Sequence, residues 1–191
     1  WMAIWWMTEA VPLAATALLP VVLFPCLGIL DAKKVTSSYI DSTIFLFLGG
    51  FLIALAMERW NLHRRIALAI IATVGSKPSS MVLGFMLAAG FLSMWISNTA
   101  TAVMMLPIGM AILTKVEDAF GRERTRSLSI CIMLSIAYGA SLGGVATLVG
   151  TPPNMVLVSV YSNTFPDNPP ITFGNWILFG IPFAALMLLI S

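Results

Sequence analysis

Long apolar runs, separated by short polar segments, dominate the chain. The runs that contain no charged residue cover residues 10–30, 42–57, 78–114, 127–166 and 168–191. A helix of about 20 mostly apolar residues crosses the hydrocarbon core of a bilayer, and the third and fourth runs are far longer than that. The pattern therefore predicts an all-α integral membrane protein in which two of the runs contain an internal turn or break.

Basic residues bracket the run 78–114 on both sides. They are Arg59, His63, Arg64, Arg65 and Lys77 before it, and Lys115, Arg122, Arg124 and Arg126 after it. Because basic loops mark the cytoplasmic side of a membrane protein, we predict that this run enters the bilayer and returns to the same face as a helical hairpin. Residues 31–41 and 167–170 have no such basic excess, so we expect them in outer loops. Residues 66–76 are apolar but too short to cross, which predicts an interfacial helix.

Three small polar residues, Ser97, Asn98 and Thr99, lie near the middle of the run 78–114. Each is a competent helix N-cap, so we predict that one helix ends before them and another begins directly behind them. The two arms are each roughly 17–19 residues, or about 25–28 Å of helix, which is nearly a full span. Spacing alone therefore leaves two readings open: a polar tip inside the membrane, or two ordinary spans joined by an exposed turn.

The run 127–166 is interrupted by the sequence Gly150-Thr151-Pro152-Pro153-Asn154. Gly150 is suited to end a helix in a left-handed cap, and Thr151 followed by Pro152 is typical of an N-cap with proline at the first helical position. We therefore predict that one helix ends near Val149 and a second begins near Pro152. The alternative is one continuous span with a proline kink, but a double proline after a glycine favours a true break.

Two helix breaks of this kind would form an ion-binding site that contains no charged side chain. A helix that ends at a break exposes carbonyls and its negative dipole end, while a helix that begins there presents free N–H groups and its positive end. Neither run contains a lysine or arginine to neutralise an anion. An anion bound there must rely on amides, hydroxyls, helix ends and a cation bound beside it, which predicts coupling to sodium.

The composition narrows the class of protein. The chain is 59% hydrophobic and 9% charged, whereas a soluble domain carries about 25% charged residues. The net charge of +2 gives no reason to expect nucleic acid as a partner, and Cys26 and Cys131 are expected to be free thiols in apolar runs. With one histidine and no metalloprotease or serine-hydrolase motif, we expect no enzyme. An uncoupled channel would need a continuous polar stripe, which the runs do not show.

Several strings resemble one transporter family. They are Leu92-Ser93-Met94-Trp95-Ile96-Ser97-Asn98-Thr99-Ala100-Thr101-Ala102, Gly150-Thr151-Pro152-Pro153-Asn154, Phe45-Leu46-Phe47-Leu48-Gly49-Gly50-Phe51 and Glu58-Arg59-Trp60-Asn61-Leu62-His63-Arg64-Arg65-Ile66-Ala67. These strings closely resemble the divalent anion:sodium symporter family, the INDY-type sodium-coupled dicarboxylate and citrate transporters. The resemblance covers essentially the whole chain and corresponds to the N-terminal half of such a transporter.

The resemblance implies an elevator-type homodimer in the inner or plasma membrane, built from two inverted repeats that each contain a re-entrant hairpin. Residues 1–77 would belong to the scaffold, residues 78–166 to the moving transport domain, and residues 167–191 to a following membrane helix. Because both ends of the chain lie inside apolar segments, we expect a fragment that lacks the second repeat.

The resemblance also implies residue roles. Ser93, Ser97, Asn98 and Gly150 would hold sodium, and Ser97, Asn98, Thr99, Thr151 and Pro152 would contact a carboxylate of a succinate-like substrate. A sodium-independent dicarboxylate exchanger and a sulfate-type anion carrier of the same family are the alternatives.

Overall fold

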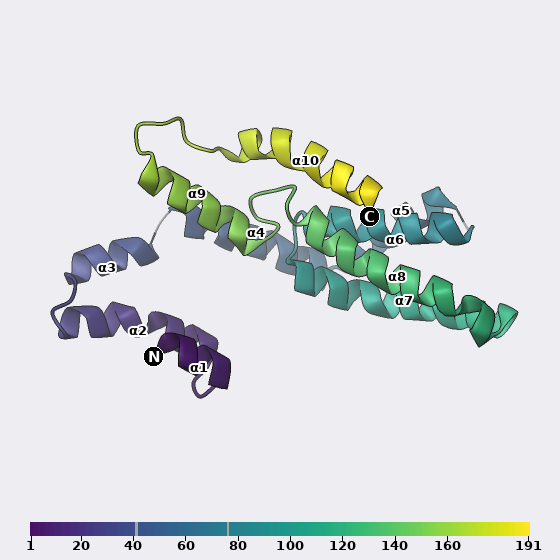
Figure 1. Cartoon of the computed structure of the whole chain (residues 1–191), viewed down its shortest axis with the longest axis horizontal. Helices are drawn as coiled ribbons and strands as arrows, with labels where there is room; N and C mark the ends of the chain where they lie inside the picture. The colour runs from purple at the N-terminus through teal and green to yellow at the C-terminus, as the bar shows by residue number, and fades with distance from the viewer. Residues whose placement is uncertain (41, 76) are drawn as a thin grey trace. The chain divides into compact units, whose positions relative to one another are not determined.

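The computed structural model describes residues 1–40, 42–75 and 77–191, and this part of the chain is built from α-helices without strands (Figure 1). The helices are α1 (Met2–Thr8), α2 (Leu13–Cys26), α3 (Ala32–Tyr39), α4 (Ser42–Arg59), α5 (Leu62–Val74), α6 (Pro78–Ser93), α7 (Asn98–Phe120), α8 (Arg122–Gly143), α9 (Pro152–Thr164) and α10 (Phe173–Ile190). The predicted all-α fold is confirmed. The chain divides into two compact units, Trp1–Phe45 and Leu46–Ser191, which we describe separately.

The first unit contains α1, α2 and α3. The predicted span 10–30 is helical only from Leu13 to Cys26, with Pro20 and Pro25 inside the helix. The predicted loop 31–41 is wrong over most of its length, because residues 32–39 form α3; Asp41 lies outside the described residues. The Asp31 carboxylate accepts a hydrogen bond from the Lys33 N–H and caps the helix. The Tyr39 hydroxyl donates to the Ala17 carbonyl at 2.7 Å and fastens α3 to α2.

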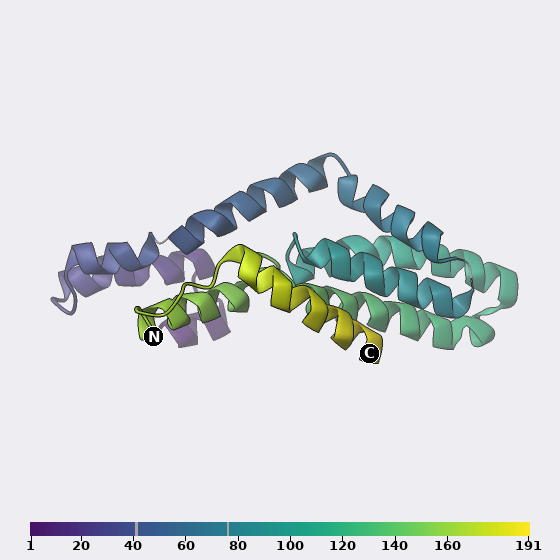
Figure 2. The same cartoon turned by 90° about the horizontal axis from the view of Figure 1, so that it is seen from above.

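The core of the second unit is formed by α6, α7 and α8, which lie side by side, with α5 packed on α6 (Figure 2). Its fully buried side chains include Phe85 and Leu92 of α6, Met105 of α7 and Ile132 of α8. Small residues bring the backbones close together. A Cβ on Gly139 would lie 3.1 Å from the Ala89 Cβ, so α6 and α8 pack closely at this level, as helices in membrane proteins commonly do.

Several helix boundaries in this unit differ from the prediction. The expected interfacial helix 66–76 is α5, which begins earlier, at Leu62; Ser76 lies outside the described residues. The expected loop 115–126 is wrong, because α7 continues to Phe120 and α8 begins at Arg122. Gly121 alone makes the turn, with a left-handed φ of 84° that suits glycine, and its N–H donates to the Glu117 carbonyl.

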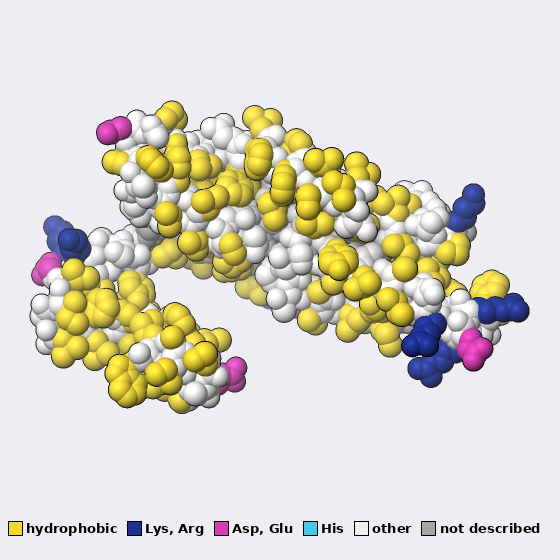
Figure 3. Space-filling model, in the orientation of Figure 1, with side chains coloured by type: hydrophobic (Ala, Val, Ile, Leu, Met, Phe, Trp, Pro, Cys, Tyr) yellow, Lys and Arg dark blue, Asp and Glu magenta, His cyan; other side chains and the backbone are white. Residues whose placement is uncertain are grey.

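Four stretches of the described chain are long and apolar enough to cross a membrane: α7, α8, α10 and one that contains α4. The helices α2 and α6 are apolar but shorter. Much of the surface is apolar, and Leu178 and Leu189 are among many exposed large hydrophobic side chains. Figure 3 shows lysine and arginine side chains gathered at the end of the second unit where α7 and α8 meet. These features agree with a protein that crosses a membrane several times.

Candidate functional site

The first helix break lies at the tip between α6 and α7. α6 ends at Ser93 and α7 begins at Asn98, which confirms the predicted helix break, although α7 begins within the polar tripeptide and not behind it. Ser97 is the N-cap of α7, and its Oγ accepts a hydrogen bond from the Ala100 N–H at 3.3 Å. The cap leaves the side chain of Asn98, the first residue of the helix, free for other contacts.

The second break separates α8 from α9, so the alternative of one continuous kinked helix is wrong. α9 begins at Pro152 with Thr151 in the N-cap position, as predicted. However, α8 ends at Gly143 rather than near Val149. Residues 144–151 form a non-helical segment, which we call the break loop. The left-handed cap expected at Gly150 is also wrong, because the left-handed glycines of the described chain are Gly28, Gly75 and Gly121.

Close packing explains why glycines occur at these positions of the second break. A Cβ on Gly150 would lie 2.5 Å from the Gly144 carbonyl oxygen and 2.9 Å from the Ser93 carbonyl oxygen, distances that real Cβ atoms do not reach. A Cβ on Gly143 would overlap the backbone of Gly90, and one on Gly144 would overlap the Asn98 side chain. The second break is therefore pressed directly against the first.

The contact between the two breaks gathers uncharged oxygen atoms. Ser93 Oγ lies 2.7 Å from Asn98 Oδ1 and 2.5 Å from the Ala140 carbonyl oxygen. The carbonyl oxygens of Ser93 and Gly144 face Gly150. We call these five atoms the oxygen cluster: Ser93 Oγ, Asn98 Oδ1 and the carbonyl oxygens of Ser93, Ala140 and Gly144. Ser93 is fully buried and Asn98 is half-buried, so the cluster lies inside the protein.

The chemistry of the oxygen cluster suits a cation. The Ser93 hydroxyl has one proton to share between two acceptor oxygens. The carbonyls come from the C-terminal ends of α6 and α8, where the helix dipole is negative. In the described chain, no group of three His, Cys, Asp or Glu side chains could hold a metal ion. A cation at this place would therefore be held by neutral oxygens, which is how unwound membrane helices coordinate sodium.

The break loop is held in place by the side chains of Asn154, Thr147 and Trp176, to which the sequence analysis assigned no role. The Asn154 amide donates to the carbonyls of Gly144 at 2.9 Å and Thr147 at 2.8 Å. The Thr147 hydroxyl donates to the Met94 carbonyl and accepts from the Gly150 N–H. The Trp176 indole N–H of α10 donates to the Val145 carbonyl at 2.9 Å. The sequence did contain a signal for these three residues, because they are uncharged polar residues inside charge-free runs. Buried polar groups must find hydrogen-bond partners, so such residues are expected to hold the backbone in place.

The structure brings together only some of the predicted site residues. Ser93 and Asn98 contribute oxygens to the oxygen cluster, and Gly150 packs against two of its carbonyl oxygens. Ser97 caps its own helix. Thr99 and Pro152 are exposed near the starts of α7 and α9, and Thr151 is half-buried with no capping hydrogen bond from its side chain. These last three residues lie at helix starts, where N–H groups are free and the dipole is positive.

Comparisons with known proteins place the sequence among transporters. The sequence profile of the citrate transporter family (CitMHS) matches residues 3–191. The sodium-dependent dicarboxylate transporter SdcS of Staphylococcus aureus (strain NCTC 8325 / PS 47) is 47% identical over 193 residues, covering 98% of this chain and 36% of the relative. SdcS of Staphylococcus saprophyticus is 45% identical over 192 residues, covering 98% of this chain and 37% of the relative. The chain thus spans little more than a third of the length of these relatives.

Proposed function

The chain belongs to the citrate transporter family, and we propose that it forms part of a sodium-coupled transporter that carries a dicarboxylate across the cell membrane. The two relatives described above are named as sodium-dependent dicarboxylate transporters, and they align with 98% of this chain. Their names favour sodium coupling over sodium-independent exchange, and a dicarboxylate over a sulfate-type anion. The same names and the helical, apolar architecture support a transporter rather than an enzyme.

The observation that carries the proposal is the meeting of two helix breaks around the oxygen cluster. Ser93 and Asn98 supply oxygens to this cluster and Gly150 packs against it, and with Ser97 these residues form the proposed sodium site. The carbonyl ends of α6 and α8 supply negative potential for the ion. Na+ is the coupling ion in this proposal.

The proposed carboxylate site lies at the starts of α7 and α9. Ser97, Asn98 and Thr99 at one start, with Thr151 and Pro152 at the other, present N–H groups and hydroxyls rather than charged side chains. A bound sodium ion next to these groups supplies the positive charge that the dicarboxylate needs. Binding of the anion and of the cation is therefore coupled by their mutual attraction.

Helix lengths support a site within the membrane. α6 has 16 residues and α9 has 13, which correspond to about 24 Å and about 20 Å of helix. Both are shorter than the hydrocarbon core of about 30 Å, whereas α7, with 23 residues, is long enough to cross it. We propose that α6 and α7 form a re-entrant hairpin, that residues 78–166 move as an elevator against a scaffold containing residues 1–77, and that a second repeat and a homodimer complete the transporter.

The experiment that tests the proposal is succinate uptake by the intact protein in proteoliposomes with an inward sodium gradient. We expect Asn98→Ala to reduce sodium-stimulated uptake at least about tenfold, because removing a ligand from a buried ion site costs about 1.5–3 kcal/mol. Asn168→Ala makes the same chemical change in the exposed loop before α10 and should leave uptake unchanged. Sodium-stimulated uptake at the wild-type level in a folded Asn98→Ala protein would refute the site.

A further inference from the structure

A groove opens at the end of α6 opposite the oxygen cluster. It has a volume of about 620 Å3 and lies between the beginning of α6, the end of α7 and the beginning of α8. Its apolar lining comes from all three helices: Met81 and Val82 of α6, Val116 and Phe120 of α7, and Leu128 of α8. We call it the basic-end groove. Its lining could hold a hydrocarbon chain.

One charged side chain, that of Arg124, lines the basic-end groove. The surrounding chain is also basic: Lys77 and residues 115–126 contain five lysines and arginines and three acidic residues. Figure 3 shows lysine and arginine side chains, with acidic ones among them, at the end of the unit where α7 and α8 meet. The groove therefore combines an apolar interior with a positively charged rim.

Two helix starts add to the positive rim. α6 begins at Pro78 and α8 at Arg122, and their N-cap residues cannot cap them through a side chain, because Lys77 has no acceptor atom and Gly121 has no side chain. The first N–H groups of a helix have no acceptor within the helix, and they carry the positive end of its dipole. Ser79 and Thr125, which line the groove, lie in these first turns. An anionic group next to Arg124 would lie in the groove that the first turns of both helices line.

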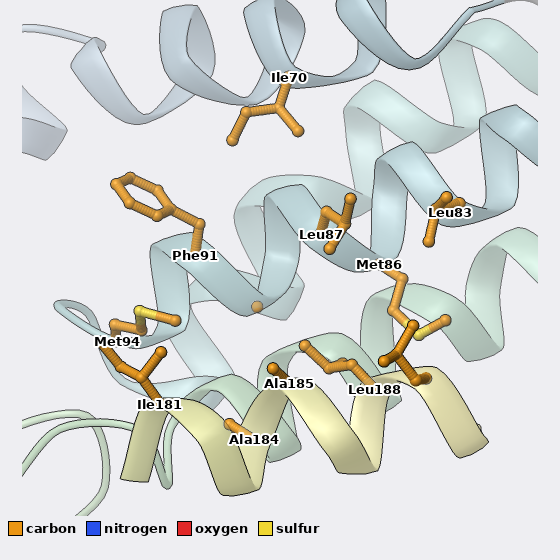
Figure 4. Close-up of a pocket in the computed structure, with 12 residues that line it drawn as sticks. Ile70, Leu83, Met86, Leu87, Phe91, Met94, Ile181, Ala184, Ala185 and Leu188 are labelled. Atoms are coloured by element: carbon orange, nitrogen blue, oxygen red, sulfur yellow. The ribbon is translucent and has the colours of Figure 1, made fainter. Parts of the chain in front are cut away.

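A comparison with the cavity between α6 and α10 shows what the charged rim contributes (Figure 4). That cavity, of about 430 Å3, is lined by apolar side chains such as Leu87, Phe91 and Ile181, without a charged or polar one. Nothing in its lining selects one apolar occupant over another. The basic-end groove, in contrast, selects a molecule with both a hydrocarbon chain and an anionic head.

We propose that the basic-end groove binds an anionic phospholipid of the bilayer, with an acyl chain along the apolar lining and the phosphate at Arg124. The basic end of a membrane protein faces the cytoplasm, and the cytoplasmic leaflet contains anionic lipids that basic pockets between membrane helices recognise. The proposal rests on the membrane location, and it is independent of which anion is transported. A soluble phosphate would satisfy Arg124 but would leave the apolar lining exposed.

Native mass spectrometry of the intact protein tests this proposal by counting the lipids that stay bound after detergent removal. At about 150 mM salt the Debye length is about 8 Å, so diffuse charge attraction is screened. We expect the wild type to retain one phosphatidylglycerol and to bind phosphatidylcholine more weakly. Arg124→Gln should lower the phosphatidylglycerol affinity at least about fivefold, the effect of one basic residue at the lipid phosphate.

Arg126→Gln is the matched control, because it removes the same charge from α8 at a residue outside the groove lining. It should change the affinity less than about twofold, since a charge that does not contact the bound phosphate is screened at this salt concentration. Equal losses in the two variants would overturn the proposal, as would equal retention of both lipids by the wild type. Displacement of the lipid by excess inorganic phosphate would also overturn it, because the site would then be one for a soluble anion.

Cys131 reports the location of the lipid, because it lines the groove and is exposed. In a background in which every other cysteine of the intact protein is replaced by serine, Cys131 is the thiol that reacts. In nanodiscs, phosphatidylglycerol should slow the reaction of Cys131 with a maleimide in the wild-type groove and leave the rate in Arg124→Gln unchanged. A rate that is the same with and without phosphatidylglycerol would place the lipid elsewhere and contradict the proposal.

Discussion

At the scale of single residues, the candidate site depends on small and uncharged side chains. Ser93 is fully buried, and its hydroxyl links Asn98 to the Ala140 carbonyl. Gly150 allows two carbonyl oxygens to approach where any Cβ would collide with them. A charged side chain at this place would compete with the transported ions. Neutral oxygens instead leave the site able to take up and release a cation.

Gly150→Ala tests whether this close approach matters for the proposed sodium site. The added methyl group would lie 2.5 Å from the Gly144 carbonyl oxygen, so we expect the break loop to shift and sodium-stimulated uptake to fall at least about tenfold, the effect of about 1.4 kcal/mol. Gly174→Ala is the control, because a Cβ there has no neighbour within 4 Å. If sodium-stimulated uptake is equal in both folded variants, the close approach has no functional role.

At the scale of elements, the break loop is where helices from different parts of the sequence meet. Thr147 bonds to the end of α6, Asn154 reaches back from α9, and Trp176 reaches over from α10. Gly180 of α10 also packs closely, because a Cβ there would lie 2.6 Å from the Ala146 carbonyl oxygen. α10 therefore supports the loop that shapes the oxygen cluster, although it contributes no atom to the cluster.

Trp176→Phe removes the hydrogen bond to the Val145 carbonyl and keeps a large aromatic ring. A hydrogen bond contributes about 0.5–1.5 kcal/mol, so we expect the sodium concentration for half-maximal uptake to rise about two- to tenfold. The maximal rate should stay close to that of the wild type. Trp60→Phe, at a residue that is 78% exposed, is the control. A lower maximal rate with unchanged sodium dependence would indicate a structural role instead.

At the scale of the whole molecule, polar chemistry is concentrated at two places along α6. The oxygen cluster lies at its C-terminal end, and the basic-end groove lies at its N-terminal end. Apolar packing with Phe85, Ala88 and Ala89 fills the length between them. α6 thus joins the proposed transport site to the end of the unit that we expect at the cytoplasmic surface.

A cysteine at Thr99 tests whether the tip of the hairpin belongs to a site that water and substrate reach. With Cys26 and Cys131 replaced by serine, we expect Thr99→Cys to react with a membrane-impermeant maleimide. Sodium plus succinate should slow this reaction, because the proposed carboxylate site includes Thr99. Ser37→Cys, on the exposed side of α3, should react at a rate that does not depend on either ligand. A Thr99→Cys rate that is independent of ligands would count against the shared site.

The sequence by itself determined where α7 and α9 begin and which runs are apolar. Ser97 before α7 and Thr151-Pro152 before α9 are local signals, because an N-cap or a first-turn proline acts within one helical turn. For the same reason the break in each long run could be predicted. The missed helix α3 and the continuation of α7 to Phe120 are errors of another kind, because charged residues were taken to mark loops.

Only the tertiary structure decided where α8 ends and which oxygens meet. The end of α8 at Gly143 depends on its contact with Gly90, and the Ser93 hydroxyl finds its acceptor 47 residues away, at Ala140. Such contacts depend on how two helices pack against each other. The local conformational preferences of the chain do not determine which residues meet across so large a separation in sequence. The roles of Asn154 and Trp176 also follow only from the tertiary structure, because packing brings their hydrogen-bond partners in the break loop within reach.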